Sequence, residues 1–150
     1  MKGTCLGVLT LTLTVAACGG SSSSSLPTPS PTVTTDILTG TVPPPVGGVL
    51  QSSFNSVTIG QGGGTVTITL TSAVETFPGG TLLTTVTMGL GIGTAAGGVC
   101  TPAQGAFTTA QGGAVPQLSG TLAAGTYCVV VSDVTSQLGP VAYAVAVAHP

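Results

Sequence analysis

The sequence predicts an all-β protein, an antiparallel β-sandwich of about seven to eight strands in the jelly-roll or immunoglobulin-like style. Apolar and polar residues alternate with a period of two over several stretches, which is typical of strands with one face in a core. Gly- and Pro-rich turn signals separate these stretches at short intervals, as they do in sandwiches. Apolar residues at helical spacing are absent from the pattern. A barrel or an open β-roll is the alternative arrangement.

The strands follow from the alternation and from the residues that interrupt it. We place seven of them near residues 37–42, 51–59, 64–71, 84–92, 116–122, 126–132 and 141–148. In the third, Val66, Ile68 and Leu70 alternate with threonines, whose β-branched side chains suit an outer pleated face. In the fourth, Val86 to Ile92, the partners are Thr and Gly. The intervening turn signals are Pro43-Pro44-Pro45, Gly60 to Gly64, Pro78-Gly79-Gly80, Gly97-Gly98, Gly112-Gly113, Ala124-Gly125 and Gly139-Pro140.

The last two strands each carry a tyrosine on the apolar face. Tyr127 is in phase with Val129 and Val131, and Tyr143 is in phase with Val145 and the other valines of its strand. The same phase predicts that both rings pack in the core rather than stack on a sugar at the surface. The chain contains no Trp, which further weakens a carbohydrate-binding interpretation.

Only four residues of the chain are charged, namely Lys2, Asp36, Glu75 and Asp133. Lys2 lies in the segment that we expect to be removed, so the mature chain contains no Lys or Arg. Affinity for nucleic acid comes mostly from cations that neutralise phosphates, and this class of partner is therefore excluded. Because 42% of its residues are hydrophobic, the chain is also not expected to be disordered throughout.

The N-terminus has the organisation of an export signal. A positively charged start is followed by a 13-residue apolar stretch from Cys5 to Ala17, which is shorter than the roughly 20 residues that a membrane-spanning helix needs. Val15-Ala16-Ala17-Cys18 resembles the lipobox of bacterial lipoproteins. This resemblance implies cleavage before Cys18 and a lipid on its sulfur. The alternatives are an ordinary secretory signal with an incidental cysteine, and a retained membrane helix.

These features divide the chain into three parts. Residues 1–17 are the lipoprotein signal peptide, residues 18–35 form a disordered lipid-anchored Gly/Ser/Pro/Thr-rich tether, and residues 36–150 form the sandwich. Two or more acyl chains anchor a protein firmly without a basic patch. We therefore expect attachment to the membrane through acyl chains on Cys18, on the exported side of the bacterial cell envelope. Gly19, where some lipoproteins carry an inner-membrane retention Asp, favours the outer membrane or cell surface.

Two cysteines remain in the sandwich, Cys100 and Cys128. An even pair in an exported domain favours a disulfide, which closes a loop of about 29 residues and stabilises it by roughly 3–4 kcal/mol. Two free buried thiols are the alternative. We expect no metal site, since His149 is the only histidine of the chain that could act as a ligand together with the two cysteines.

The C-terminal third resembles a known family. Gly125-Thr126-Tyr127-Cys128-Val129-Val130-Val131 and Tyr143-Ala144-Val145-Ala146-Val147 are similar to the closing strand pair of bacterial pre-peptidase C-terminal (PPC) domains, and Gly64 to Leu70 resembles an earlier strand. The similarity covers roughly residues 50–148. It implies a jelly-roll-like or immunoglobulin-like sandwich, an accessory role and no catalysis. The chain differs from the usual pattern in lacking a peptidase domain and in having few acidic residues, so a calcium site is not expected.

Signals for an active site are weak. His149 stands at a strand end that is expected to fray, and Asp36, Glu75 and Asp133 are expected to be solvated charges at the tether and in loops; Asp133 could also cap its turn. The segment from Gly91 to Ala96 has the form G-x-G-x-x-A of a dinucleotide-binding turn. The following glycines and Pro102 exclude the required helix, so turn glycines are the preferred explanation.

We therefore expect a non-catalytic, lipid-anchored envelope protein whose sandwich is an interaction or structural accessory module. The alternative is a surface ligand-binding or adhesive lipoprotein that recognises glycan, peptide or envelope polymer. No cofactor is expected, and an envelope protein or glycan is the expected kind of partner. Prolines beside the predicted strands favour sheet edges that are protected from pairing, and hence a monomeric domain; the alternative is an edge strand that pairs with a strand of a partner.

Overall fold

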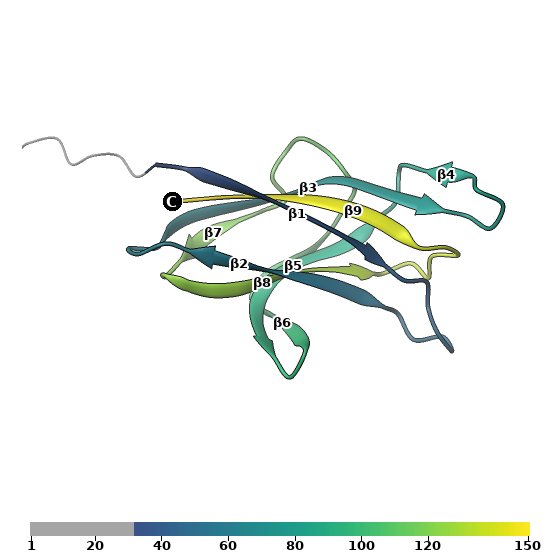
Figure 1. Ribbon diagram of the computed structural model, residues 1–150, viewed down its shortest axis with the longest axis horizontal. Helices are drawn as coiled ribbons and strands as arrows, with labels where there is room; N and C mark the ends of the chain where they lie inside the picture. The colour runs from purple at the N-terminus through teal and green to yellow at the C-terminus, as the bar shows by residue number, and fades with distance from the viewer. Residues whose placement is uncertain (1–31) are drawn as a thin grey trace, which may run out of the picture. The chain divides into compact units, whose positions relative to one another are not determined.

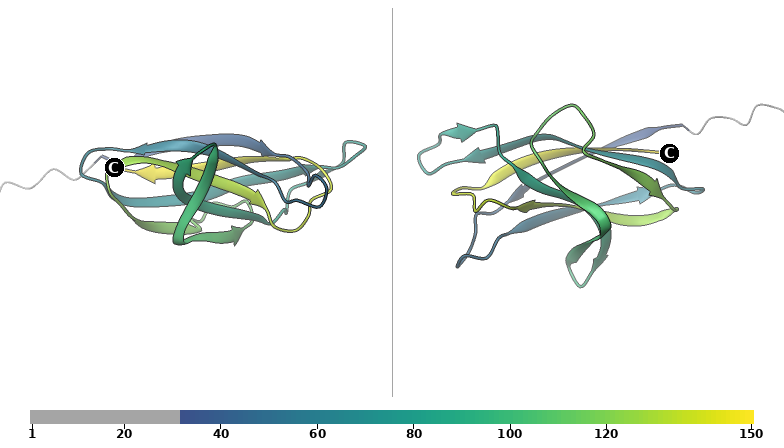
Figure 2. Two further views of the ribbon diagram at one scale, coloured as in Figure 1. Left: turned by 90° about the horizontal axis from the view of Figure 1, so that it is seen from below. Right: turned by 180° about the vertical axis from the view of Figure 1, so that it is seen from behind.

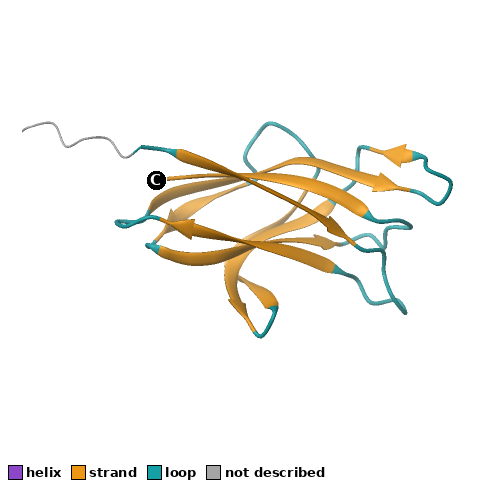
Figure 3. Cartoon of the chain, viewed as in Figure 1, coloured by secondary structure: helices purple, strands orange, loops and turns teal. Residues whose placement is uncertain are grey.

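The structure is a computed structural model, and it describes residues 32–150. These residues contain nine β-strands (Figure 1). Between them lie only loops and turns (Figure 3). The strands are β1 (Thr34–Val42), β2 (Ser52–Ile59), β3 (Gly64–Thr76), β4 (Leu82–Leu83), β5 (Met88–Ala96), β6 (Val99–Ala110), β7 (Leu118–Leu122), β8 (Gly125–Asp133) and β9 (Val141–His149).

The strands form two antiparallel sheets. In the first, the order is β1-β9-β3, and both β7 and β4 pair with β3, β7 near its start and β4 at its end. In the second, the order is β2-β8-β5-β6. The sheets pack face to face, as the views in Figures 1 and 2 show. The predicted all-β sandwich is confirmed, with each of the seven predicted strand positions holding a strand. Residues 32–150 belong to one compact unit with its own core.

The core lies between the two sheets and follows the predicted alternation. Its buried members include Val66, Ile68 and Leu70 of β3, together with apolar residues of β5, β8 and β9. Tyr143 is also buried in this core, and Tyr127 packs against it, as their phase predicts. The Tyr143 hydroxyl joins the two sheets: it donates to Ser53 Oγ of β2 at 3.0 Å and accepts from the Asn55 amide of β2 at 3.0 Å.

Strand β3 is five residues longer than the alternation suggests, because a bulge at Thr71 changes its phase. Leu70 pairs with Val145 of β9 and Ser72 pairs with Ala144, so Thr71 is left over. Before the bulge the inward residues have even numbers; after it, Ala73 and Glu75 are buried. A bulge inserts one extra residue and thereby reverses which residues face the core. Glu75 is brought inside by this reversal.

Strand β6 was not predicted, because Pro102 and Gly105 interrupt its sequence. It is the edge strand of the second sheet, a position where a proline does not remove a ladder hydrogen bond. The predicted strand at 84–92 also lies farther along the chain, at Met88–Ala96. A two-residue turn at Gly97 and Gly98, both with positive φ as a tight hairpin turn requires, joins β5 to β6.

The glycines of the Gly91 to Ala96 segment lie inside β5 rather than in a turn, and the turn-glycine explanation is wrong. They are needed because β6 crosses closely over the outer face of β5. A Cβ added at Gly91 would contact the Phe107 ring and Pro102, and one added at Gly93 would collide with the backbone of Thr101. A continuous strand also lacks the strand-turn-helix geometry of a dinucleotide site.

Candidate functional site

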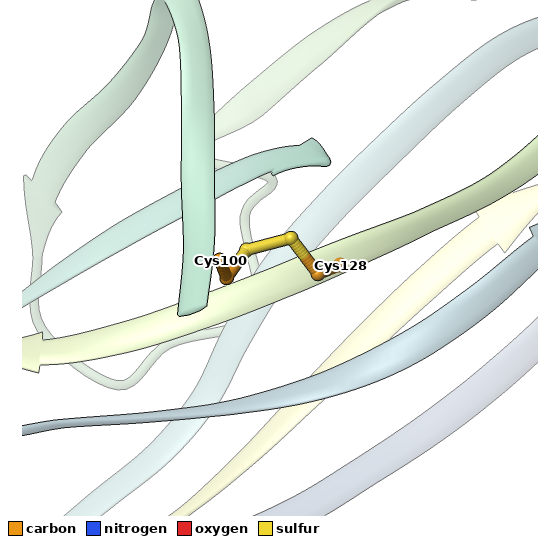
Figure 4. Close-up of a disulfide and its surroundings, with 2 residues drawn as sticks. All are labelled: Cys100 and Cys128. Atoms are coloured by element: carbon orange, nitrogen blue, oxygen red, sulfur yellow. A yellow bond between two sulfur atoms is a disulfide. The ribbon is translucent and has the colours of Figure 1, made fainter. Parts of the chain in front are cut away.

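A disulfide joins Cys100 of β6 to Cys128 of β8, with 5.8 Å between their Cα atoms (Figure 4). Both strands pair with β5: Cys100 lies opposite Ala95 and Cys128 opposite Gly93. The bridge therefore crosses β5 on the outer face of the second sheet, where it is buried with Val130. The predicted disulfide is present, and it fastens the start of an edge strand to the centre of its sheet. A disulfide of this kind indicates an extracytoplasmic domain.

The carboxylates of Glu75 and Asp133 were expected to be solvated loop charges, and this expectation is wrong. Both are strand residues, 4% and 2% exposed respectively. Their oxygens accept the N–H groups of five consecutive residues of the β8–β9 loop. The Asp133 carboxylate accepts from residues 135, 136 and 137 at 2.9, 2.8 and 3.1 Å, and Glu75 Oε1 accepts from residues 138 and 139 at 2.6 and 2.9 Å.

The loop therefore has its backbone donors satisfied by two buried carboxylates. Burying a charge is costly unless it is hydrogen-bonded, and each carboxylate here accepts at least two backbone hydrogen bonds. The role of Asp133 as a cap of its own turn is confirmed.

His149 and Asp36 form the third polar arrangement. His149 ends β9 and is 6% exposed rather than frayed, and Asp36 belongs to β1 rather than to the tether. His149 Nε2 lies 3.2 Å from Asp36 Oδ2. The Pro150 carbonyl, and then Asp36, raise the pKa of the imidazole, while burial opposes them. This pair ties the first strand to the last at the end of the sandwich where the chain enters.

Within residues 32–150, no group of three or more His, Cys, Asp or Glu side chains is placed to hold a metal ion. The same residues contain no helix that is long and apolar enough to cross a membrane. Cys18, the expected lipidation site, and the signal peptide of residues 1–17 lie outside the described residues, as does most of the tether.

A cleft of about 250 Å³ opens between β7 of the first sheet and β6 of the second. Its walls are mainly aliphatic, with Ile68 and Leu122 on one side and Ile92 and Ala106 on the other. A second hollow of about 200 Å³ adjoins it and shares Ile92, Ala106 and Leu122. The sequence pattern did not reveal this cleft, because β6 was not recognised as a strand.

A second surface feature, distinct from the cleft, is one end of the sandwich that is rich in exposed apolar side chains. Three segments meet there: the β1–β2 loop, the β3–β4 hairpin and the β8–β9 loop. Backbone hydrogen bonds connect them, from Asp133 N to Gln51 O at 2.9 Å and from Thr76 N to Pro140 O at 3.0 Å. We call this surface the apolar loop end. Its large exposed side chains are Val46, Val49, Leu50, Leu82, Leu83 and Leu138.

The apolar loop end lies at the other end of the strands from the chain entry. Strand β1 begins at Thr34, opposite His149, and ends at Val42, opposite Val141, so the three loops follow the far ends of the strands. Exposure ranges from 38% at Leu83 to 72% at Leu138. None of the four Asp, Glu and His side chains of the described residues is exposed within it: Glu75 and Asp133 are buried beneath, and Asp36 and His149 lie at the other end.

Comparisons with protein-family models, with curated proteins and with solved structures found no match to this chain.

Proposed function

We propose that this chain is a lipid-anchored protein of the bacterial cell envelope whose PPC-like sandwich is a non-catalytic interaction module. The apolar loop end is the observation that carries the proposal. Large exposed apolar side chains that gather on one surface mark sites where another molecule binds. The partner is a protein with an uncharged, apolar surface, because the loop end has no exposed charge to pair with one.

The ionisable groups support a role without catalysis. Among the described residues, Glu75 and Asp133 hold a loop, His149 pairs with Asp36, and the two cysteines are oxidised. A general acid or base must reach a proton on a substrate, and a nucleophile needs a free thiol or an activated hydroxyl. These groups are already engaged in holding the fold.

The anchor and the loop end are compatible in their positions along the chain. The lipobox-like Val15-Ala16-Ala17-Cys18 precedes a tether that enters the sandwich at β1, and the disulfide supports an oxidising, exported location. Because the apolar loop end lies at the far ends of the strands, an anchor at the chain entry leaves it accessible to an envelope partner.

In-cell photocrosslinking tests the interaction. A photoreactive amino acid replaces Leu82 in the loop end, and in a matched strain it replaces Gln61, which is exposed in the β2–β3 turn at the other end of the sandwich. We expect a discrete crosslinked species from position 82 that disappears when Leu138→Ser is added. Equal crosslinking from both positions, or none from position 82, contradicts the proposal.

A further inference from the structure

The β6–β7 cleft exists because strand β7 has no side chain at its centre. Gly120 pairs with Val66, which is buried, so both residues face the interior of the sandwich. On either side of it, Leu118 and Leu122 pack against the core. A Cβ added at Gly120 would meet no atom within 4 Å. The glycine therefore leaves a gap in a row of aliphatic side chains.

The facing wall is opened by β6. Gly91 of β5 pairs with Phe107, whereas Gly93 pairs with Pro102, so residues 103–106 bulge out of the ladder. Gly105 adopts a φ of 75° in this bulge, and it also lines the cleft. Where β6 departs from the ladder, Ile92 has a partner on β8 but none on β6, and its side chain lines the cleft.

We propose that this cleft binds an uncharged aliphatic chain, the hydrocarbon part of a neutral lipid or long-chain alcohol. Asp36, Glu75, Asp133 and His149 are the Asp, Glu and His side chains of the described residues, and none of them lines the cleft or the adjoining hollow. A carboxylate or ammonium group would thus enter without a counter-ion. The neutral Gln104, Ser119 and Thr121 at the walls suit a hydroxyl head group.

The size of the site agrees with this ligand. A cavity of about 150 Å³ lined by aliphatic and aromatic side chains is sufficient to bind benzene. The cleft alone has about 250 Å³, and the adjoining hollow extends it past Ile92 toward Tyr127. A chain of methylenes fits two hollows that share walls better than a single compact ring does. This site is separate from the apolar loop end and does not depend on the proposed function.

Titration by NMR tests the proposal. The sandwich from residue 32, which carries both sheets and the disulfide, is produced in an oxidising compartment with ¹⁵N label and titrated with 1-octanol, octanoate and octylammonium. We expect saturable shifts for 1-octanol at the amides of Gly105, Gly120 and Leu122, with at least fivefold weaker binding of the two charged probes. Gly120→Leu should reduce the affinity for 1-octanol at least tenfold.

Two further variants complete the test. Gly113→Leu adds the same side chain where a Cβ also meets no atom within 4 Å, but outside the cleft, and should bind 1-octanol within twofold of the unmodified sandwich. Ala106→Leu fills the cleft from the facing wall and should also reduce the affinity for 1-octanol. It replaces Gly120→Leu in the test if that variant does not fold. Shifts that do not saturate, that lie elsewhere, that persist in both filled variants, or that are equal for all three probes overturn the proposal.

Discussion

Replacing Glu75 with Ala removes the acceptor of the Leu138 and Gly139 N–H groups, which are 2.6 and 2.9 Å from Oε1. The Gly139 group is buried, and a buried donor left without a partner costs about 1–3 kcal/mol. Two such donors, with some access of water at Leu138, predict a loss of about 2–5 kcal/mol in the free energy of unfolding. Glu75→Gln keeps one acceptor oxygen for these N–H groups but loses the charge and replaces the other oxygen with an NH2 group, so about 1–2 kcal/mol is expected.

The same loop supplies a test of cooperation between the two carboxylates. Asp133→Ala removes the acceptors of three more N–H groups of the loop. Once one carboxylate is lost, the loop relaxes and the second has less left to stabilise, so the double variant should lose less than the sum of the two single losses.

Urea unfolding followed by far-UV circular dichroism measures all of these variants, with the slope of the transition as a check that the unfolded surface is unchanged. A Glu75→Ala loss below about 0.5 kcal/mol would mean that Glu75 does not hold this loop, and a double variant that loses the full sum would mean that the two carboxylates act independently.

Three further predictions concern other parts of the sandwich. Removing the Cys100–Cys128 bridge should lower the free energy of unfolding by about 3 kcal/mol, and the untreated protein should show no alkylatable thiol at these positions; two reactive thiols would contradict the disulfide. The raised pKa of His149 means that its contribution to stability is fully present below its ordinary value of 6.5 and is lost as the pH rises through the raised pKa, so the melting temperature should fall over that interval; a pH-independent difference from His149→Gln would contradict this. Gly93→Ala should destabilise the sandwich by more than about 2 kcal/mol because its Cβ collides with the Thr101 backbone, whereas Gly120→Ala should stabilise it by about 0.4–1 kcal/mol; the reverse order in thermal melts would contradict the packing described for β5 and β7.

The parts of the fold that the sequence predicts are those with uninterrupted alternation. Val66, Ile68 and Leu70 mark β3 because each faces the core while a threonine faces outward. The phase of Tyr143 likewise places its ring inside. Such patterns depend only on neighbours in the chain, and turn glycines such as Gly97 and Gly98 add the positions of the reversals.

The parts that could not be predicted depend on partners far away in the sequence. The bulge at Thr71 is defined by its pairing with β9, and only this bulge turns Glu75 inward to meet the β8–β9 loop. Strand β6 contains Pro102 and Gly105, which in the sequence indicate a turn. Their presence in a strand is explained only by the edge position of β6 in the sheet. Gly120 by itself does not predict the cleft, since the cleft forms only where β7 faces β6 of the other sheet.

Metabolic labelling with a clickable palmitate tests whether the protein is exported and anchored through Cys18. The unmodified chain and Cys18→Ser are expressed in bacteria, and the envelope fraction is separated from the soluble fraction. We expect that the unmodified chain takes up label and is found in the envelope, and that Cys18→Ser takes up none. Label of equal strength in Cys18→Ser, or an unlabelled and soluble unmodified chain, would contradict this expectation.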